Sequence, residues 1–361
     1  MGDQVSHSDL MTKAESLVRI AAPQLLDQPY ETWNFGDSTG FEGLVRASEL
    51  LAMPEFDAFA YAWFRAWATR AEPYRRLDCT APGLAIVTCA QRHGDSELLG
   101  AAESLGRYLL TRRKIRGAYE TWESSPLMAP YGGEELPPDE QVLLDRKPPG
   151  VFIDCLHFDP PFFAALAKAT GNSKWADEAI EQAQAYIDNL QLNSGLFEHF
   201  FLDGVPDKTF GPGWGRGQGW ALLGLLDVIE QLELPPDSTI VESAQKLIKA
   251  MVNVQRSDGH WAVVVTDPDS GDEPSTAAFM ATGFMRAKEL GVVEGHEVDA
   301  PVDAALSAII SDCDEQGRLS GVSRAVMACT RPSHYANVPR GFNVPWGQGP
   351  LVLALLEKIK T

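Results

Sequence analysis

Two kinds of helical segment alternate along the chain. One kind repeats apolar residues at intervals of three and four and carries charges on the opposite face, which predicts a helix at a surface. The other kind is rich in Ala, Gly, Leu and aromatic residues and poor in charge, which predicts a helix buried on all sides. The amphipathic segments are 8–26, 56–71, 97–112, 174–192, 238–256 and 298–312, and the buried segments are 43–52, 82–91, 155–169, 217–230, 275–287 and 347–357.

Helix pairs of this kind stack side by side and bury a continuous inner layer. The segments form six pairs that recur at intervals of roughly 40–75 residues. An unpaired helix at the start can meet one at the end, so the natural closure is a ring. We therefore predict an all-α fold, an (α/α)6 barrel with six inner and six outer helices. An open solenoid is the alternative, but the Gly-rich inner segments and long loops favour closure.

Four long connections, rich in Pro and Gly, each run into the start of a buried segment. Loops of this length in a compact domain are usually functional, so we expect them to meet at one end of the barrel and to wall a single pocket. The sequence GHWAVVV at 259–265 is expected to form a short strand there. No stretch resembles a linker, which predicts a single catalytic domain over residues 1–361. The loops are 113–151, 193–214, 258–274 and 314–345.

Composition narrows the possible partners. With 45% hydrophobic residues and a net charge of -20, the chain has an ordinary globular composition and should repel nucleic acid. The first residues, MGDQVSHSDLMTKAESL, are not expected to act as a signal peptide, and no apolar run approaches the ~18 residues of a membrane span. Five cysteines without CxxC spacing predict reduced thiols in a cytoplasmic protein, and the seven dispersed histidines show no zinc ligand set. We expect no membrane partner, and a monomer or homodimer.

Asp154, in the segment GVFIDCLHFDPPF, is the leading catalytic candidate. An Asp before a helix is often only an N-cap. Its apolar neighbours, however, would strip water from the carboxylate, which suits a group that acts as acid and then as base. Asp159 precedes two prolines and is expected to cap or orient. Asp78, in RRLDCTAPG, occupies the matching position before another buried segment, so it is either a second acid at the same rim or a cap.

The segment GPGWGRGQGW gathers four further candidates, Trp214, Arg216, Gln218 and Trp220. Its glycines let the backbone approach a ligand closely. An arginine beside flat aromatic faces is what a sugar carboxylate needs. The alternative is that the tryptophans belong to the core and that Arg216 pairs with an internal acid. His199, in GLFEHFF, could contact the same ligand. Further rim candidates, which could equally be packing residues, are Trp33, Tyr335, Trp346, Trp261 and Arg340.

In their order and spacing, several motifs resemble the unsaturated glucuronyl and rhamnogalacturonyl hydrolases, glycoside hydrolase families 88 and 105. They cover nearly the whole chain: WNFGD, LDCTAPG, VFIDCLHFDPPF, GLFEHFF, WGRGQGW, DGHW, EPSTAAFM and PWGQGP. The resemblance implies an (α/α)6 barrel and a substrate, left by a polysaccharide lyase, with a 4-deoxy-4,5-unsaturated uronic acid at its non-reducing end. No metal or organic cofactor is expected.

The resemblance also implies residue roles. Asp154 would protonate C4 of the enol ether and activate the water that adds at C5, with Asp78 as a second acidic residue nearby. Arg216 and Trp220 would lie in the uronate pocket, and His199 would contact the sugar. The chain departs from the family pattern after the catalytic Asp, at Gln218 and in the run Glu273-Pro274-Ser275-Thr276. These departures leave the leaving sugar open.

Two other functions fit the same residues. One is a conventional glycosidase for saturated uronides that uses Asp78 and Asp154 as a carboxylate pair. The other is a sugar-binding barrel without catalytic activity.

Overall fold

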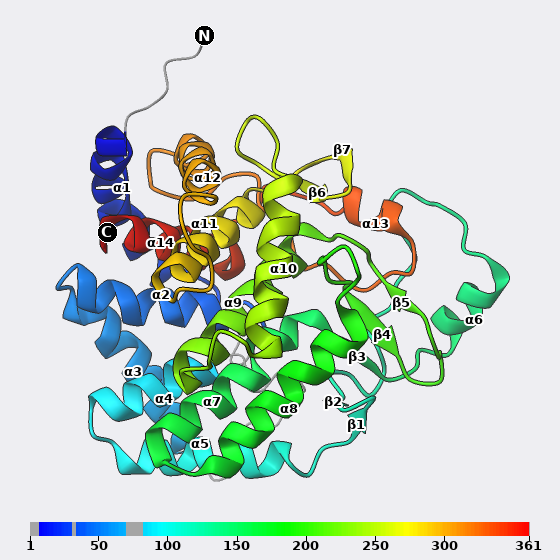
Figure 1. The fold of residues 1–361 in the computed structure, drawn as a ribbon, viewed down its shortest axis with the longest axis horizontal. Helices are drawn as coiled ribbons and strands as arrows, with labels where there is room; N and C mark the ends of the chain where they lie inside the picture. The colour runs from blue at the N-terminus through cyan, green and yellow to red at the C-terminus, as the bar shows by residue number, and fades with distance from the viewer. Residues whose placement is uncertain (1–6, 31–33, 70–81, 361) are drawn as a thin grey trace.

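A closed ring of six inner helices forms the centre of the protein (Figure 1). The computed structural model describes residues 7–30, 34–69 and 82–360. Around the ring each inner helix packs against the next, and the last packs against the first. The inner helices are α2 (Asp37–Leu50), α4 (Gly83–Arg92), α7 (Asp159–Thr170), α9 (Gly215–Leu232), α11 (Pro274–Glu289) and α14 (Pro345–Lys360).

Each inner helix has an amphipathic neighbour on the outside. This arrangement confirms the predicted barrel of six inner and six outer helices. None of the helices in the described part of the chain combines the length and apolar content needed to cross a bilayer. The outer helices are α1 (His7–Ala21), α3 (Pro54–Ala68), α5 (Ser96–Leu109), α8 (Ser173–Leu190), α10 (Thr239–Asn253) and α12 (Asp299–Ser311).

Two glycines allow inner elements to approach closely. A Cβ atom at Gly349 of α14 would lie 2.6 Å from the backbone of Thr39 in α2, at the seam where the ring closes. A Cβ atom at Gly224 of α9 would overlap the carbonyl group of Leu156. Since neither neighbour is a flexible side chain, both positions need a residue without a Cβ atom.

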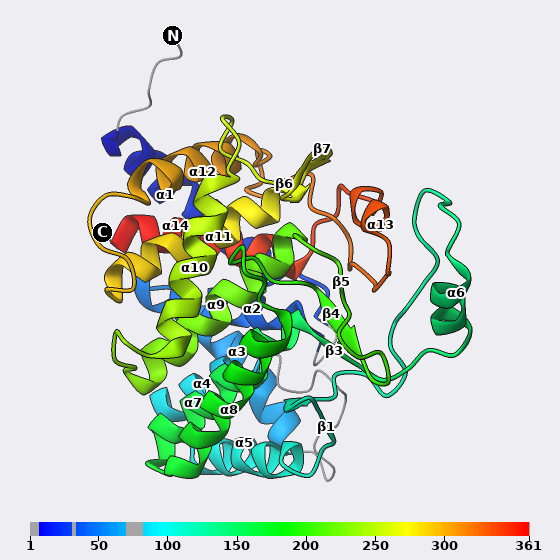
Figure 2. The ribbon, with the colours of Figure 1, turned by 45° about the vertical axis from the view of Figure 1, so that its right-hand side comes forward.

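The four long connections, 113–151, 193–214, 258–274 and 314–345, lie on one side of the barrel, towards the right in Figures 1 and 2. They contain three small antiparallel sheets, so the protein is not purely helical. The expected strand within 259–265 is present as β6. The elements are β1 (Lys114–Ile115) with β2 (Ala118–Tyr119), β3 (Gly150–Phe152) with β4 (Phe200–Leu202) and β5 (Thr209–Phe210), β6 (Ala262–Val264) with β7 (Asp267–Asp272), and the helices α6 (Pro138–Asp145), α13 (Pro332–Ala336) and the 3-10 helix η1 (Ala22–Leu25).

The segment predicted as one helix over 155–169 is interrupted. A 3-10 helix, η2 (Ile153–His157), ends at His157, and α7 starts afresh at Asp159. Pro160 and Pro161 explain the break, because a proline has no N–H to donate backwards and is favoured in the first turn of a new helix. Another boundary was also misplaced: α2 begins at Asp37, six residues before the predicted start.

Gly224→Ala should destabilise the protein, because the new methyl group would push η2 away from α9. We expect a loss of about 1–3 kcal/mol in the free energy of unfolding. Gly100→Ala is the matched control, since Gly100 lies in α5 with no heavy atom near its Cβ position. In that open place the substitution should instead stabilise by roughly 0.5–1 kcal/mol. Urea denaturation of both variants measures the difference, and equal stability of the two would contradict the predicted contact.

Candidate active site

A cavity of about 470 Å³ lies where η2 and the starts of α2 and α9 meet the long loops. Its volume falls within the usual range of small-ligand sites, and most of its lining is apolar. Asp154 is the only carboxylic acid among the described residues that line it. The lining residues are Asn34, Phe35, Thr121, Trp122, Pro126, Phe152, Asp154, Cys155, Phe158, His199, Trp214, Arg216, Ala325, Val326 and Met327.

Strand pairing brings Asp154 and His199 together. Phe152 of β3 pairs with Phe200 of β4, and just beyond this pair Ile153 N–H donates to the carbonyl oxygen of His199 at 2.8 Å. In this antiparallel register, one Asp154 oxygen lies 3.5 Å from His199 Nε2. Asp154 does not cap a helix, because the N-cap residues of η2 and α7 are Phe152 and Phe158. The carboxylate is therefore not occupied by an N-capping interaction.

His199 is fixed from behind by Tyr335. Its Nδ1 lies 2.7 Å from the Tyr335 hydroxyl, and its ring packs 4.4 Å from the ring of Trp214. Tyr335 is itself buried in α13 and lies behind the cavity lining, where burial raises the pKa of its hydroxyl well above the ordinary value. The hydroxyl therefore stays protonated at neutral pH. A chain of side chains thus runs from Asp154 through His199 to Tyr335.

Arg216 is fully buried at the start of α9 and lines the cavity. Its guanidinium donates to Ser323 Oγ at 2.8 Å and to the Arg324 carbonyl oxygen at 2.9 Å, and it lies 3.4 Å from Glu273 Oε2. Its Nε–H has no hydrogen bond within the described part of the chain. Burial lowers the pKa of Arg216, although the negative charges of Glu273 and Asp154 oppose the shift. Arg216 therefore has an internal acidic partner, as one interpretation of the sequence predicted, and it also faces the cavity.

Trp214 and Gln218 have different surroundings. Trp214 is the N-cap residue of α9, lines the cavity and lies 5.3 Å from the Arg216 guanidinium, a cation–π distance. Gln218 lies outside the lining, and its amide joins α9 to the strand-forming loop. The Gln218 amide accepts from Phe197 N–H and donates to the Phe197 and Trp214 carbonyl oxygens.

The remaining sequence candidates lie behind the cavity or outside the described residues. Trp220 is fully buried, with its ring 4.7 Å from Phe279, so it packs the barrel core. Trp346 is half-buried at the start of α14 and donates to the Ser323 carbonyl oxygen. Trp33 and Asp78 lie outside the described residues.

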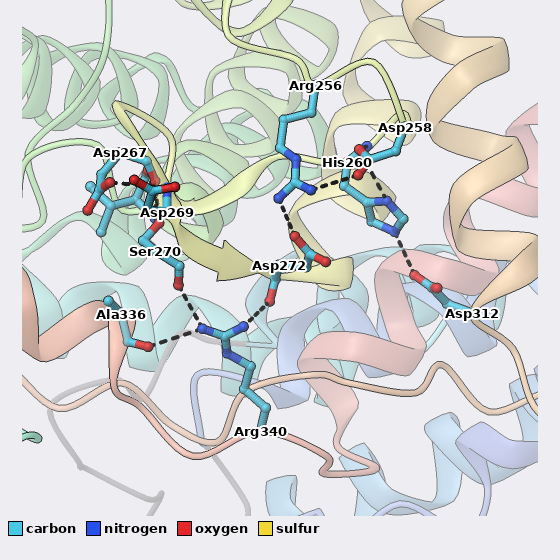
Figure 3. Close-up of polar contacts among 11 residues, drawn as sticks. Arg256, Asp258, His260, Asp267, Asp269, Ser270, Asp272, Asp312, Ala336 and Arg340 are labelled. Carbon is cyan, nitrogen blue, oxygen red and sulfur yellow. Dashed lines mark hydrogen bonds and ion pairs between the residues drawn. The ribbon is translucent and has the colours of Figure 1, made fainter.

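Arg340, a weaker rim candidate, fastens the hairpin of β6 and β7 to α13 (Figure 3). Its guanidinium donates to the carbonyl oxygens of Ser270, Asp272 and Ala336 at 2.8–3.1 Å. Arg340 therefore supports the helix that carries Tyr335. Trp261 is fully buried and bonds the Met251 carbonyl oxygen, so it is a packing residue.

Several lining residues were missed by the sequence analysis. Trp122 and Pro126 come from the loop 113–151, and Ala325, Val326 and Met327 come from the loop 314–345. Only the length of these loops indicated their role, because nothing in the sequence specifies which of their residues face inwards.

A larger cavity of about 580 Å³ lies between α11, α12 and α14. Three lysines line it, and each is paired with a carboxylate: Lys288 with Asp299, Lys358 with Asp303 and Lys360 with Glu289. With its cations paired, this groove lacks the convergent unpaired groups of a catalytic site. The cavity at Asp154 is therefore the candidate active site.

Known proteins resemble large parts of the chain. The unsaturated rhamnogalacturonyl hydrolase YesR of Bacillus subtilis (strain 168) is 26% identical over 269 residues, which are 72% of this chain and 76% of that protein. An unsaturated 3S-rhamnoglycuronyl hydrolase of Alteromonas sp. (strain LOR) is 26% identical over 178 residues, 47% of this chain and 43% of that protein.

Solved structures share the fold. A possible member of the GH105 family from Salmonella enterica superposes with a TM-score of 0.82 at 19% identity, covering 100% of this chain and 96% of that one. The unsaturated glucuronyl hydrolase of Bacillus sp. GL1 superposes with a TM-score of 0.70 at 18% identity, covering 96% of both chains. A profile of glycosyl hydrolase family 88 matches residues 9–361. The chain therefore belongs to glycosyl hydrolase family 88.

Proposed function

We propose that this glycoside hydrolase removes a 4-deoxy-4,5-unsaturated uronic acid from the non-reducing end of lyase-generated oligosaccharides. The observation that carries the proposal is that Asp154 lines the cavity beside His199 and the buried cation Arg216, so an acid–base group lies next to a partner for a uronate carboxylate. The names of relatives that act on unsaturated rhamnogalacturonyl and rhamnoglycuronyl groups support the same substrate class.

In the proposed reaction, Asp154 acts first as an acid and then as a base. Its carboxyl proton goes to C4 of the enol ether, and water adds its oxygen at C5 while its proton returns to the carboxylate. The product is a hemiketal at C5, which opens to a ketone and releases the rest of the saccharide from C1. One water is consumed and Asp154 is regenerated. No bond forms between the enzyme and the anomeric carbon.

The other cavity residues would bind and orient the sugar. Arg216 would attract the uronate carboxylate, and Trp214 would offer an apolar face to the ring. His199, 3.5 Å from Asp154, would contact the sugar and orient the carboxyl group. Tyr335 and Gln218 would act indirectly, by holding His199 and the start of α9.

The direct test follows the ultraviolet absorbance of the conjugated enol-ether carboxylate in lyase-digested pectin, ulvan or glycosaminoglycan fragments. Loss of absorbance on incubation is the expected result. Release of intact glucuronic acid from saturated glycosides, with unchanged absorbance, would instead indicate a two-carboxylate glycosidase. Sugar binding without any turnover would indicate a barrel without catalytic activity.

Asp154→Asn should remove nearly all turnover, because an amide cannot give up and regain the proton. We expect a fall in kcat of at least about 10³-fold, within the range of general acid–base contributions. Glu198→Gln is the matched control, since Glu198 lies one residue before His199 and outside the cavity lining. Its activity should stay within a few-fold of wild type. Circular dichroism checks the fold, and near-normal turnover in a folded Asp154→Asn variant would disprove the mechanism.

Arg216→Ala should weaken both binding and folding. Without Arg216, the uronate carboxylate would lose its buried cationic partner, which should cost about 2–4 kcal/mol of binding free energy. The variant also leaves Glu273 buried without its arginine, which should cost about 3–5 kcal/mol of stability. Glu273→Gln breaks the same pair but keeps the cation, so it should lower the Tm while substrate affinity falls far less. Equal affinity losses in the two variants would assign Arg216 a purely structural role.

Tyr335→Phe should lower kcat with little change in KM, because it frees His199 without altering the cavity lining. Loss of one hydrogen bond of about 1 kcal/mol corresponds to a roughly fivefold fall in rate. Tyr119→Phe is the control. The Tyr119 hydroxyl donates to Glu178 over 2.7 Å, and neither residue lines the cavity. The control should lose stability and keep its kcat. A rise in KM without a fall in kcat would instead mean that Tyr335 binds substrate directly.

A further inference from the structure

His157 lies in the layer of side chains directly beneath the cavity at Asp154. The ring of Phe158 lines that cavity, and the His157 ring lies 5.9 Å from Phe158 and 5.3 Å from Trp220. Trp220 follows the cavity residue Arg216 by one turn of α9. His157 itself is 1% exposed and does not line the cavity. Any effect of His157 on the reaction must therefore pass through the turn η2.

Two carboxylates face the two ring nitrogens of His157, one carboxylate at each nitrogen. Nε2 lies 3.3 Å from a Glu42 oxygen of α2, and Nδ1 lies 3.4 Å from Asp227 Oδ2 of α9. A neutral imidazole carries a single N–H, so it would direct a lone pair at one of these carboxylates. An imidazolium donates from both nitrogens. The geometry therefore favours a ring that carries two protons.

The charges around the ring favour the same state. Burial lowers the pKa of His157, and Arg286 acts in the same direction, but Glu42 and Asp227 outweigh both and raise the pKa above the ordinary value of 6.5. Arg286 lies 2.7 Å from Asp227 Oδ1. This contact favours the ionised carboxylate, whose other oxygen faces His157.

The other elements packed against η2 are α7, α8 and β3. Tyr186 of α8 interacts with Cys155 of η2 and with Asp159 of α7, and burial raises the pKa of its hydroxyl well above the ordinary value. The strand β3 carries no titratable side chain. These groups border the Cys155 side of the turn, so the charge on His157 is set by the two carboxylates and the arginine described above.

We propose that His157 is a positioning residue: as an imidazolium it ties η2 to α2 and α9, and it thereby holds Asp154 beside His199. The inference rests on the proposed function, because it takes Asp154 as the reacting acid. His157 follows Asp154 by three residues, one turn of the 3-10 helix. On the cavity side, Asp154 lies 3.5 Å from His199 Nε2. A turn anchored at His157 therefore fixes the carboxyl group that must meet the sugar.

The first test counts the protons on the ring without any sugar, so it does not depend on the proposed function. The seven histidines are labelled with 15N, and their ring nitrogens are followed by NMR from about pH 5 to pH 9. His157→Gln identifies the His157 signals by their loss. Both ring nitrogens should be protonated at about pH 7, with a midpoint above 6.5. If His157→Gln fails to fold by circular dichroism, Glu42→Gln identifies the same signals, because it should lower this midpoint.

The second test measures positioning. In folded His157→Gln the turn loses its charged anchor, so the signals of His199 should shift as the Asp154 carboxyl group moves. The kcat on unsaturated oligosaccharides should fall about tenfold with little change in KM, since a 1 Å misplacement can cost ~10²-fold and the cavity lining is unchanged. Glu42→Gln should change both readouts in the same direction.

His260→Asn is the control for both readouts. His260 pairs with Asp258 and Asp312, none of which lines the cavity (Figure 3). The hydrogen bond with Asp312 raises the pKa of His260 above 6.5, so this variant also removes a histidine that favours the protonated state. The His199 signals and the kcat should stay as in wild type.

Two results would overturn the proposal. One is a neutral His157 ring at about pH 7, which would place the proton on Asp227, whose pKa is raised by burial. The other is unchanged His199 signals and kcat in folded His157→Gln, or in Glu42→Gln in its place, which would leave His157 a role in stability alone. A wild type inert towards every unsaturated substrate would contradict the proposed function instead, and the His199 signals would still decide whether His157 positions Asp154.

Discussion

The contact between the first and last inner helices is the constraint on which the rest of the structure depends. The backbones of α14 and α2 meet at Gly349 and Thr39, so closely that no Cβ atom fits at position 349. Gln348 secures the same seam, since its amide donates to the carbonyl oxygens of Ala21 and Gly317 and accepts from Leu319 N–H. The end of the chain thereby joins both its first helix and the loop 314–345. Ring closure and the placement of that loop therefore depend on the same side chain.

Closure also sets the local electrostatics of the active site. The helices α2, α7 and α9 begin beside the cavity, and the N-terminal end of a helix carries partial positive charge. Arg216, at the start of α9, adds a full positive charge to one of these ends. The chain as a whole has a net charge of -20, yet the local charges at this mouth of the barrel favour an anionic group over a cationic one. Long-range repulsion and local attraction thus act on different scales.

The helical periodicity of the sequence was sufficient to predict the barrel, and local motifs predicted Asp154, His199, Trp214 and Arg216, which line one cavity. Spacing could not distinguish residues that face the cavity from those that hold them, since both occur in the same short segments. The break before α7 was missed because apolar periodicity continues across it. The ion pairs of His157 with Glu42 and Asp227 were not visible because the three residues come from elements far apart in the chain. Such convergence depends on packing, which a one-dimensional pattern does not contain.

The turn η2 is held from two sides, and this explains why Asp154 can be placed precisely on a short irregular element. On the cavity side, β3 and β4 fix the backbone at Ile153 and Phe152. On the core side, Gly224 of α9 admits the carbonyl group of Leu156, and His157 faces two carboxylates. The contacts of His157 with Glu42 and Asp227 therefore help the core side to hold the turn. Because Asp154 and His157 are three residues apart on one turn, the contacts of His157 in the barrel core also constrain the position of the Asp154 carboxyl group.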